Sequence, residues 1–231
     1  MRAVEASPTE SGSVRIAERD GGLEALLPGD RPGRGLVVDW SRLDLRGIAG
    51  QPMVRALGKA RSVLDATAGL GYDSFLIAAT GRTVVAVERR EPVFRLLADA
   101  HRRATGDARL AAIAGRITVV HGDARERIAE RSDLSEAIYL DPMFPPKRHA
   151  TALPPKEMQV VRALAGDDPD TEGLLAAARA SGVRVVLKRP RHAAEGPCDF
   201  ALGGKLARFE VYLPKSAAGR DRMAPGTEGG G

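Results

Sequence analysis

Residues 140–148 read LDPMFPPKR, in which an acidic residue closes an apolar run and is followed at once by Pro, Met and Phe. One interpretation is a rigid turn with Phe144 covering the core, because proline ends strands and restricts the backbone. The other is a site for a flat amine, in which Asp141 and the Pro142 carbonyl accept its two N–H bonds and Phe144 stacks on its ring. Such hydrogen bonds direct the nitrogen lone pair at an electrophile, so the stretch favours group transfer to an exocyclic amine.

Three further acidic residues stand at the ends of predicted strands. Asp65 ends the first strand, Glu88 ends the second and Asp123 follows the third. In open parallel sheets, ligands bind beyond the carboxyl ends of the strands. There Glu88 can accept both hydroxyls of a ribose, and Asp123 can accept from an adenine amino group. Together with Asp141, these positions predict a nucleoside cofactor.

The loop after the first strand, within DATAGLGYD, indicates which cofactor. Gly69 and Gly71 have no Cβ and let the backbone turn tightly against a ligand. The NAD fingerprint has a third glycine where this chain has Ser74, and it places a pyrophosphate at the helix start. Asp73 at that place repels a pyrophosphate but suits a cation. S-adenosylmethionine (AdoMet) carries an ammonium and a sulfonium and no phosphate, so the acidic loop favours AdoMet over NAD.

Apolar strand-like runs alternate with helical periodicity through most of the chain. Strands are expected at 62–66, 83–88, 116–122, 136–141, 183–190 and 205–214, and helices at 72–80, 92–104, 123–131, 156–165 and 170–182. This alternation predicts an α/β, Rossmann-like fold: a mostly parallel sheet with an antiparallel last strand and helices on both faces.

The predicted domain is flanked by segments without clear periodicity. Residues 1–21 and 215–231 are expected to be disordered tails. Residues 22–61 form an N-terminal extension of the domain at 62–214. In this extension, GLVVDW (35–40) is a candidate strand and PMVRALGKA a candidate helix.

Composition excludes several classes of protein. The 231 residues are 43% hydrophobic with a net charge of +5, which is ordinary for a soluble domain. The single cysteine, Cys198, permits no internal disulfide and no cysteine-based zinc site, and the four histidines lack metal-ligand spacing. No apolar run reaches the ~20 residues that span a bilayer, and the N-terminus lacks a signal-peptide core. We therefore expect a cytoplasmic protein without a metal.

Several stretches, taken in order, resemble one family. DATAGLGYD, VERR, HGDA, YLDPMFPPK, KEMQVVRALAG and VVLKRP resemble the bacterial 16S ribosomal RNA guanine-N2 methyltransferases of RsmJ type, over roughly residues 35–213. The resemblance implies a class I methyltransferase sheet, AdoMet as the cofactor and methylation of a guanine N2 amine. It implies cofactor contacts at Tyr72, Asp73, Glu88, Arg89, Asp123, Ala124 and Asp141. This chain departs from the family at Tyr72, where relatives carry Arg, and at Asp123–Ala124, where they carry Ser-Ser.

Basic residues follow the proline-rich motif and the fifth strand, where an RNA backbone would approach. They are Lys147, Arg148, Lys156, Lys188, Arg189 and Arg191. Any one of them is typical of solvated surface, but the group favours a nucleic-acid substrate. The expected partner is 16S ribosomal RNA or the small ribosomal subunit, with no membrane and a monomeric enzyme.

Alternatives remain open at this point. Adenine N6 and a protein glutamine amide present the same NH₂ geometry to Asp141. A non-catalytic RNA-binding assembly factor with a retained cofactor pocket is another class, and the missing third glycine disfavours an NAD-dependent dehydrogenase.

Overall fold

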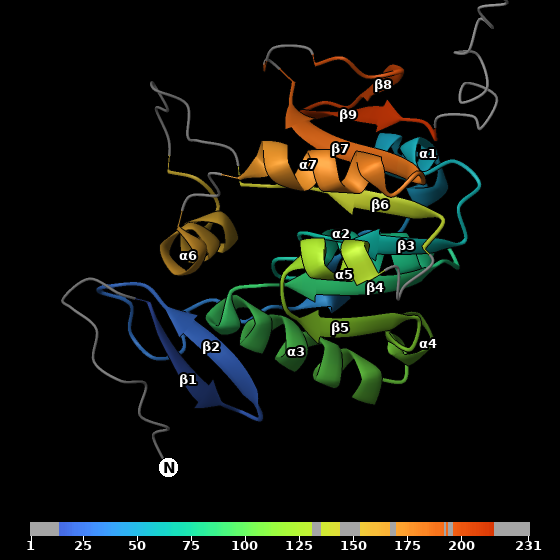
Figure 1. Ribbon diagram of the computed structural model, residues 1–231. Coiled ribbons are helices and arrows are strands. Elements are labelled where there is room, and N and C mark those ends of the chain that lie inside the picture. Colours follow the sequence, from blue (N-terminus) through green and yellow to red (C-terminus); the bar gives the residue numbers. More distant parts are fainter. Residues whose placement is uncertain are drawn as a thin grey trace, which may run out of the picture.

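The computed structural model describes residues 14–130, 135–143, 153–166, 170–191, 193 and 196–214. In these residues the main sheet has seven strands in the order β5-β4-β3-β6-β7-β9-β8 (Figure 1). The strands are β3 Ser62–Asp65, β4 Thr83–Glu88, β5 Ile117–His121, β6 Ala137–Leu140, β7 Arg184–Pro190, β8 Phe200–Gly203 and β9 Ala207–Tyr212.

Strand order reverses in the middle of this sheet. Strands β5, β4, β3, β6 and β7 pair in parallel, and β9 pairs antiparallel with both β7 and β8. From β3 the chain moves outward through β4 and β5, then returns to the other side of β3 as β6, where Asp65 and Tyr139 are register partners. Ligands bind at such a switch point. The predicted, mostly parallel sheet with an antiparallel last strand is confirmed, although the edge strand β8 was not predicted.

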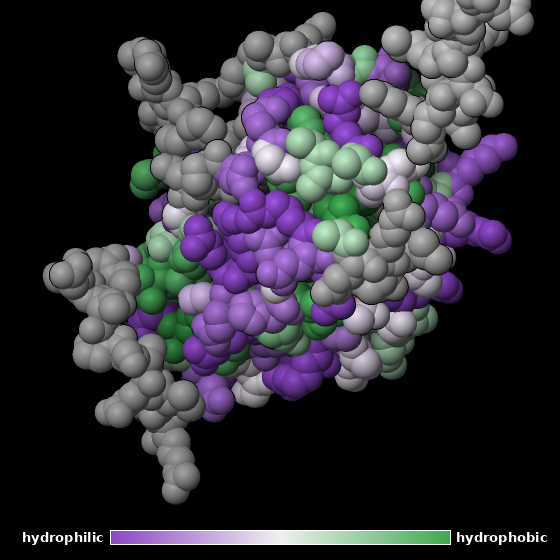
Figure 2. All heavy atoms as spheres, in the orientation of Figure 1, coloured by the Kyte–Doolittle hydropathy of each residue, from purple (hydrophilic) through white to green (hydrophobic). Residues whose placement is uncertain are grey.

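Side-chain alternation along the strands divides the core into two layers. Val63, Val84 and Tyr139 project into the layer that contains α1, α2 and α3, whereas Leu64 and Ile138 project into the layer with α5 and α7. Both faces of the parallel strands are therefore apolar and covered. Figure 2 shows that hydrophilic residues occupy much of the middle of the outer surface in this view. The helices are α1 Pro52–Ala56, α2 Tyr72–Ala79, α3 Glu91–Gly106, α4 Ala111–Ala114, α5 Ala124–Glu130, α6 Lys156–Ala165 and α7 Thr171–Ala180.

An N-terminal hairpin corrects the expectation of a tail as far as residue 21. Strand β1, Arg15–Arg19, pairs antiparallel with β2, Gly22–Leu26. The turn between them has positive φ at Asp20 (50°) and Gly21 (78°), as Asp-Gly favours in two-residue hairpins. Asp-Gly between two short strands was therefore a hairpin signal in the sequence. It was missed because the composition of residues 1–21 favoured a disordered tail.

The candidate strand at 35–40 is wrong. Leu36 forms an isolated bridge to Ala25, and a 3-10 helix, η1 Trp40–Arg42, follows. Leu36, Val38 and Trp40 are buried at alternate positions, as in a strand, but they belong to an extended segment that packs on the core and not to a sheet. A second 3-10 turn, η2 Ile48–Gly50, leads into α1 at the predicted helical stretch.

Helix α6 and the hairpin lie beyond the carboxyl ends of the parallel strands (Figure 1). The Lys156 ammonium at the start of α6 lies 2.8 Å from Asp30 Oδ2 in the segment after β2, and it also donates to the Arg34 carbonyl. These contacts connect α6 to the N-terminal segment and form a wall opposite the strand ends. Among the described residues, no helix is both long and apolar enough to cross a bilayer.

Candidate active site

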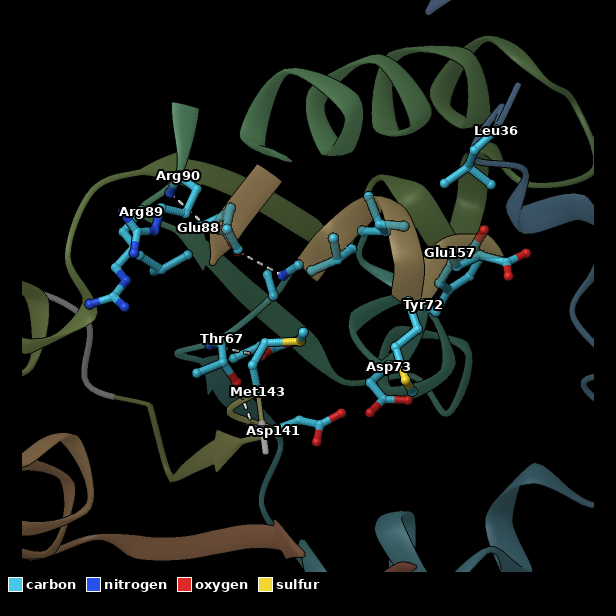
Figure 3. Close-up of a pocket in the computed structure, with 18 of the residues that line it drawn as sticks. Leu36, Thr67, Tyr72, Asp73, Glu88, Arg89, Arg90, Asp141, Met143 and Glu157 are labelled. Atoms are coloured by element: carbon cyan, nitrogen blue, oxygen red, sulfur yellow. Dashed lines mark hydrogen bonds between the residues drawn. The ribbon is translucent and has the colours of Figure 1, made fainter. Parts of the chain in front are cut away.

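A cavity of about 1130 Å³ lies at the carboxyl ends of the parallel strands. Loops after β3, β4, β5 and β6 form one side, and the N-terminal segment with α6 forms the other (Figure 3). Ligand pockets commonly measure ~300–1,000 Å³, so this cavity has room for a cofactor and a substrate group together. Of the expected cofactor residues, all but Gly71 line it: Asp65, Gly69, Tyr72, Asp73, Glu88, Arg89, Asp123, Ala124 and Asp141.

Gly71 does not line the cavity but lies against the side chains of Trp40 and Leu97. Its φ is +79°, and a Cβ at this position would lie 2.5 Å from both Trp40 Cζ2 and Leu97 Cδ1. The Trp40 indole N–H donates to the Leu70 carbonyl at 3.1 Å, so the buried tryptophan fixes the same loop. Sequence reasoning missed Trp40, because nothing local to residue 40 indicates a partner thirty positions away.

Glu88 joins the glycine loop to the end of β4. Its Oε2 accepts from the Gly69 N–H at 3.0 Å and its Oε1 accepts from the Arg90 N–H at 2.7 Å (Figure 3). Burial raises the pKa of Glu88, although these backbone N–H groups oppose the shift. Each carboxylate oxygen has two lone pairs. Glu88 can therefore hold the loop and still accept from ribose hydroxyls.

Lys188 lies at the centre of a charged cluster. Its ammonium, reaching from β7, lies 2.7 Å from Asp141 Oδ2 and 2.8 Å from Asp73 Oδ2. The buried Tyr139 hydroxyl donates to Asp73 Oδ2 at 2.6 Å. Figure 3 shows the carboxylates of Asp73 and Asp141 turned toward each other. Burial acts to lower the pKa of Lys188, but the attraction of both carboxylates outweighs it and raises that pKa above its usual range.

Asp141 is fixed at both its backbone and its side chain. Its N–H donates to Thr67 Oγ1 at 2.6 Å, and Lys188 binds its Oδ2. Burial raises the pKa of Asp141 to about 6, against the attraction of the Lys188 ammonium. Pro142 and Met143 also line the cavity, whereas Phe144 lies outside the described residues. Thr67, another residue that the sequence prediction missed, stands inside the DATAGLG motif and offered a hydroxyl as its only signal.

Asp65 is the most buried acid at the site, at 1% exposure. The Ser74 hydroxyl donates to its Oδ2 and the Thr67 N–H donates to its Oδ1 at 3.2 Å. Burial raises the pKa of Asp65 to about 7, although the Ser74 hydrogen bond opposes the shift. Ser74, at the place of the third glycine in the NAD pattern, thus connects α2 to β3.

The far end of the cavity is formed by the residues expected near adenine. Arg125 donates to Asp123 from its backbone N–H at 2.9 Å and from Nη2 at 2.6 Å. These Arg125 bonds hold the pKa of Asp123 below its usual range. Arg89 and buried Ala124 line the cavity beside it. Asp123 therefore faces this end as a carboxylate that already has a cationic partner.

The basic residues expected on an RNA-facing rim are placed differently from one another. Lys188 is ion-paired inside the cavity, and Arg189 pairs with the fully buried Glu210 at 2.9 Å, so neither has the exposed position that was expected. Lys156 lines the cavity and pairs with Asp30. Arg191 is exposed beyond β7. The two others, Lys147 and Arg148, lie outside the described residues.

The cavity residues fit a cationic, phosphate-free cofactor. The Lys188 ammonium binds Asp73 and Asp141, and a third carboxyl group, Asp65, feels the charge of these two carboxylates. Asp73 also stands in the first turn of α2, where its charge disfavours a phosphate. AdoMet brings an ammonium, a sulfonium and ribose hydroxyls, which match the acidic loop and Glu88. No cluster of side chains suited to a metal ion occurs in the part of the chain that the structure describes.

Comparison with known proteins agrees with this geometry. Residues 37–214 match the family described as "Putative SAM-dependent methyltransferase". The chain is 39% identical to ribosomal RNA small subunit methyltransferase J of Chromohalobacter salexigens, over 93% of its length and 90% of that protein. It is 40% identical to the protein of the same name from Pseudomonas aeruginosa, over 90% and 84% of the two chains.

A solved structure supports the same conclusion. The crystal structure of a SAM-dependent methyltransferase from Neisseria gonorrhoeae superimposes with a TM-score of 0.68 at 31% identity, covering 92% of this chain and 87% of that one. The predicted class I methyltransferase fold with AdoMet as its cofactor is thereby confirmed. The chain belongs to the ribosomal RNA small subunit methyltransferase J family of SAM-dependent methyltransferases.

Proposed function

We propose that this enzyme transfers a methyl group from AdoMet to the exocyclic N2 amine of a guanine in 16S ribosomal RNA. The printed name of its relatives supports small-subunit ribosomal RNA as the substrate, and the resemblance at LDPMFP supports the guanine amine. One observation carries the chemistry: Asp141 lines the cavity with Oδ2 bound to Lys188, while its Oδ1 has no hydrogen bond to any described residue. That oxygen is available to an incoming amine.

Asp141 and Pro142 address the weak nucleophilicity of a base amine, whose lone pair is delocalised into the ring. In the proposed complex, Asp141 Oδ1 and the Pro142 carbonyl accept the two N–H bonds, so the lone pair points toward the methyl group. When bound, AdoMet would supply that methyl on a sulfonium and would leave as S-adenosylhomocysteine. Alignment of this kind can contribute as much as ~7–11 kcal/mol. Phe144 is proposed to stack on the base.

The same carboxylate is placed to receive the proton that the amine loses. An unperturbed aspartate, with a pKa of about 3.9, is a weak base at neutral pH. Burial raises the pKa of Asp141 to about 6, which brings it closer to the pH at which general bases are most effective. Glu88 is proposed to bind the ribose of AdoMet, with Arg89 and Asp123–Ala124 around its adenine and Tyr72 along its methionine side.

The test is transfer of labelled methyl from AdoMet to small subunits or naked 16S ribosomal RNA from cells that lack this gene, with mass mapping of the product. We expect one methylguanosine. Asp141→Ala should lower kcat by about 100-fold or more and leave RNA affinity within a few-fold. Asp44→Ala, which removes an exposed carboxylate on the surface, is the matched control.

Other outcomes separate the alternatives. A product at adenine N6 would replace the guanine assignment. Complementation of the deleted gene by Asp141→Ala, without methylation, would instead support a non-catalytic assembly factor.

A further inference from the structure

Lys188 has a position that methyl transfer to an amine does not by itself require. It lies on β7, which pairs with β6, the strand that Asp141 follows, and its side chain is 27% exposed. Its ammonium contacts Oδ2 of Asp141 and Oδ2 of Asp73 at once. The bond to Asp141 engages Oδ2, so it favours one orientation of the carboxylate and leaves Oδ1 for another partner.

The surroundings of this ammonium are strongly acidic. Three acidic residues surround it: Asp65 at the end of β3, Asp73 at the start of α2 and Asp141 directly after β6. The Tyr139 hydroxyl on β6 donates to Asp73. Lys188 is the cation bonded to two of these three carboxyl groups. Without it, Asp73 and Asp141 would be adjacent like charges, and like charges disfavour ionisation of both.

We propose that Lys188 is a positioning residue for the methyl transfer, holding the Asp141 carboxylate charged and turned so that Oδ1 meets the target amine. The inference rests on the proposed function. It differs from the expectation that Lys188 contacts RNA phosphates, because its ammonium is already bonded to two carboxylates. Lys188 thus acts on the reaction through Asp141 and Asp73, without touching RNA.

The two roles predict different kinetic defects. Loss of a phosphate contact weakens RNA binding and reduces its salt dependence, which raises KM. Loss of a positioning group lowers kcat and changes its pH profile, because Asp141 then ionises at a higher pH. Lys188→Met keeps the aliphatic stem and removes the charge, whereas Lys188→Arg keeps the charge. Lys59→Met removes an exposed ammonium that does not line the cavity and serves as the control.

The experiment has one measurement on the protein without cofactor and one on the reaction. Carboxyl ¹³C NMR of aspartate-labelled protein, with Asp141 assigned from the Asp141→Ala spectrum, should show Asp141 titrating at least about one pH unit higher in Lys188→Met. The acid limb of kcat should move by the same amount. A shift of the Asp141 pKa from about 6 to about 7 halves the ionised fraction at pH 7, so kcat there should fall at least about two-fold, with KM for RNA within about three-fold. Lys188→Arg should restore most of both.

Three results would overturn the inference. These are an unchanged Asp141 titration in Lys188→Met, a raised KM with unchanged kcat, and a loss of kcat that is equal at every pH and follows a lowered Tm. If the wild-type protein methylates no ribosomal RNA, the proposed function fails, while the NMR titration still reports whether Lys188 controls Asp141.

Discussion

Lys188 and Arg189 are neighbours on β7, yet they enter two opposite kinds of charged cluster. Strand alternation turns Lys188 to the face of Tyr139 and Asp73, and Arg189 to the face of Glu210. The first cluster, the open site, consists of Asp65, Asp73, Asp141, Tyr139 and Lys188 and lines the cavity. The second, the closed cluster, consists of Glu210, Arg189, Arg208 and Tyr212 and lies away from the cavity.

In the closed cluster two guanidinium groups, those of Arg189 and Arg208, bind one carboxylate. Glu210, with no exposed surface, accepts from Arg208 Nη2 at 2.7 Å, from Arg189 Nε at 2.9 Å and from the Tyr212 hydroxyl at 3.0 Å. Burial acts to raise the pKa of Glu210, but these bonds outweigh it and hold the pKa below its usual range. A buried carboxylate that is satisfied in this way serves to join β7 and β9.

The open site has the reverse balance. Lys188 binds two of its three carboxyl groups, Asp73 and Asp141, and burial raises the pKa of Asp65 to about 7 and that of Asp141 to about 6. Perturbation of this kind in a cleft is typical of catalytic groups, because a base must titrate near the working pH. The comparison teaches that burial of charge alone does not mark a functional site. What distinguishes the open site is acid in excess of its cationic partners, beside a cavity.

The largest expected difference is in stability. Glu210→Ala leaves two guanidinium groups without their buried carboxylate, and removal of one partner from a buried pair typically costs about 3–5 kcal/mol. The Asp141 side chain is 34% exposed, and in Asp141→Ala the Lys188 ammonium still has its bond to Asp73. This variant should therefore lose less than about 1 kcal/mol of unfolding free energy. Urea unfolding followed by circular dichroism measures both. An equal loss of the free energy of unfolding in the two variants would contradict the distinction.

Only part of this contrast could be predicted from sequence. Hydrophobic periodicity located β4 and α6 at their observed bounds, and strand ends located Asp65, Glu88 and Asp141 at the cavity. These succeed because parallel strands share one carboxyl edge, so order along the chain predicts proximity at that edge.

The partners of buried charges were not predictable in the same way. From the sequence, Lys188 and Arg189 were predicted to be exposed basic residues. Strand alternation shows that they point to opposite faces of the sheet, but it does not show which carboxylate each of them binds. Glu210 lies on an antiparallel strand, opposite Leu187 in the register, and that register is set by packing. Trp40 was missed for the same reason, since its contact with the Leu70 carbonyl depends on how the N-terminal segment docks.

The next expected effect is on the pH dependence of stability. Because the pKa of Asp65 is about 7 in the folded chain and about 3.9 when unfolded, the folded state binds more protons between these values. The contribution of Asp65 to stability is therefore present below about pH 4 and is lost as pH rises to about 7. Asp65→Asn keeps the hydrogen-bonding shape without the charge.

We expect the unfolding free energy of Asp65→Asn, relative to wild type, to increase from pH 4 to pH 7 and then to level off. Urea unfolding at a series of pH values checks this. Asp44→Asn is the control that should stay flat between pH 4 and pH 7, because hydrogen bonds from Arg46 lower the pKa of Asp44 and confine its effect on stability to more acidic pH. A relative stability of Asp65→Asn that is constant across this range would show that Asp65 is ionised when buried.

The smallest expected effect compares two tyrosines that make the same kind of bond, one in each cluster. The Tyr139 hydroxyl donates to Asp73 at 2.6 Å and the Tyr212 hydroxyl donates to Glu210 at 3.0 Å. Each Tyr→Phe change should cost about 1 kcal/mol of stability. Only Tyr139→Phe should also lower kcat, by a few-fold, because Asp73 then draws the Lys188 ammonium away from Asp141. Glu210 retains both arginines in Tyr212→Phe, so kcat should not change. Parallel losses of kcat in the two variants would mean that the clusters are coupled through β7 and are not separate units.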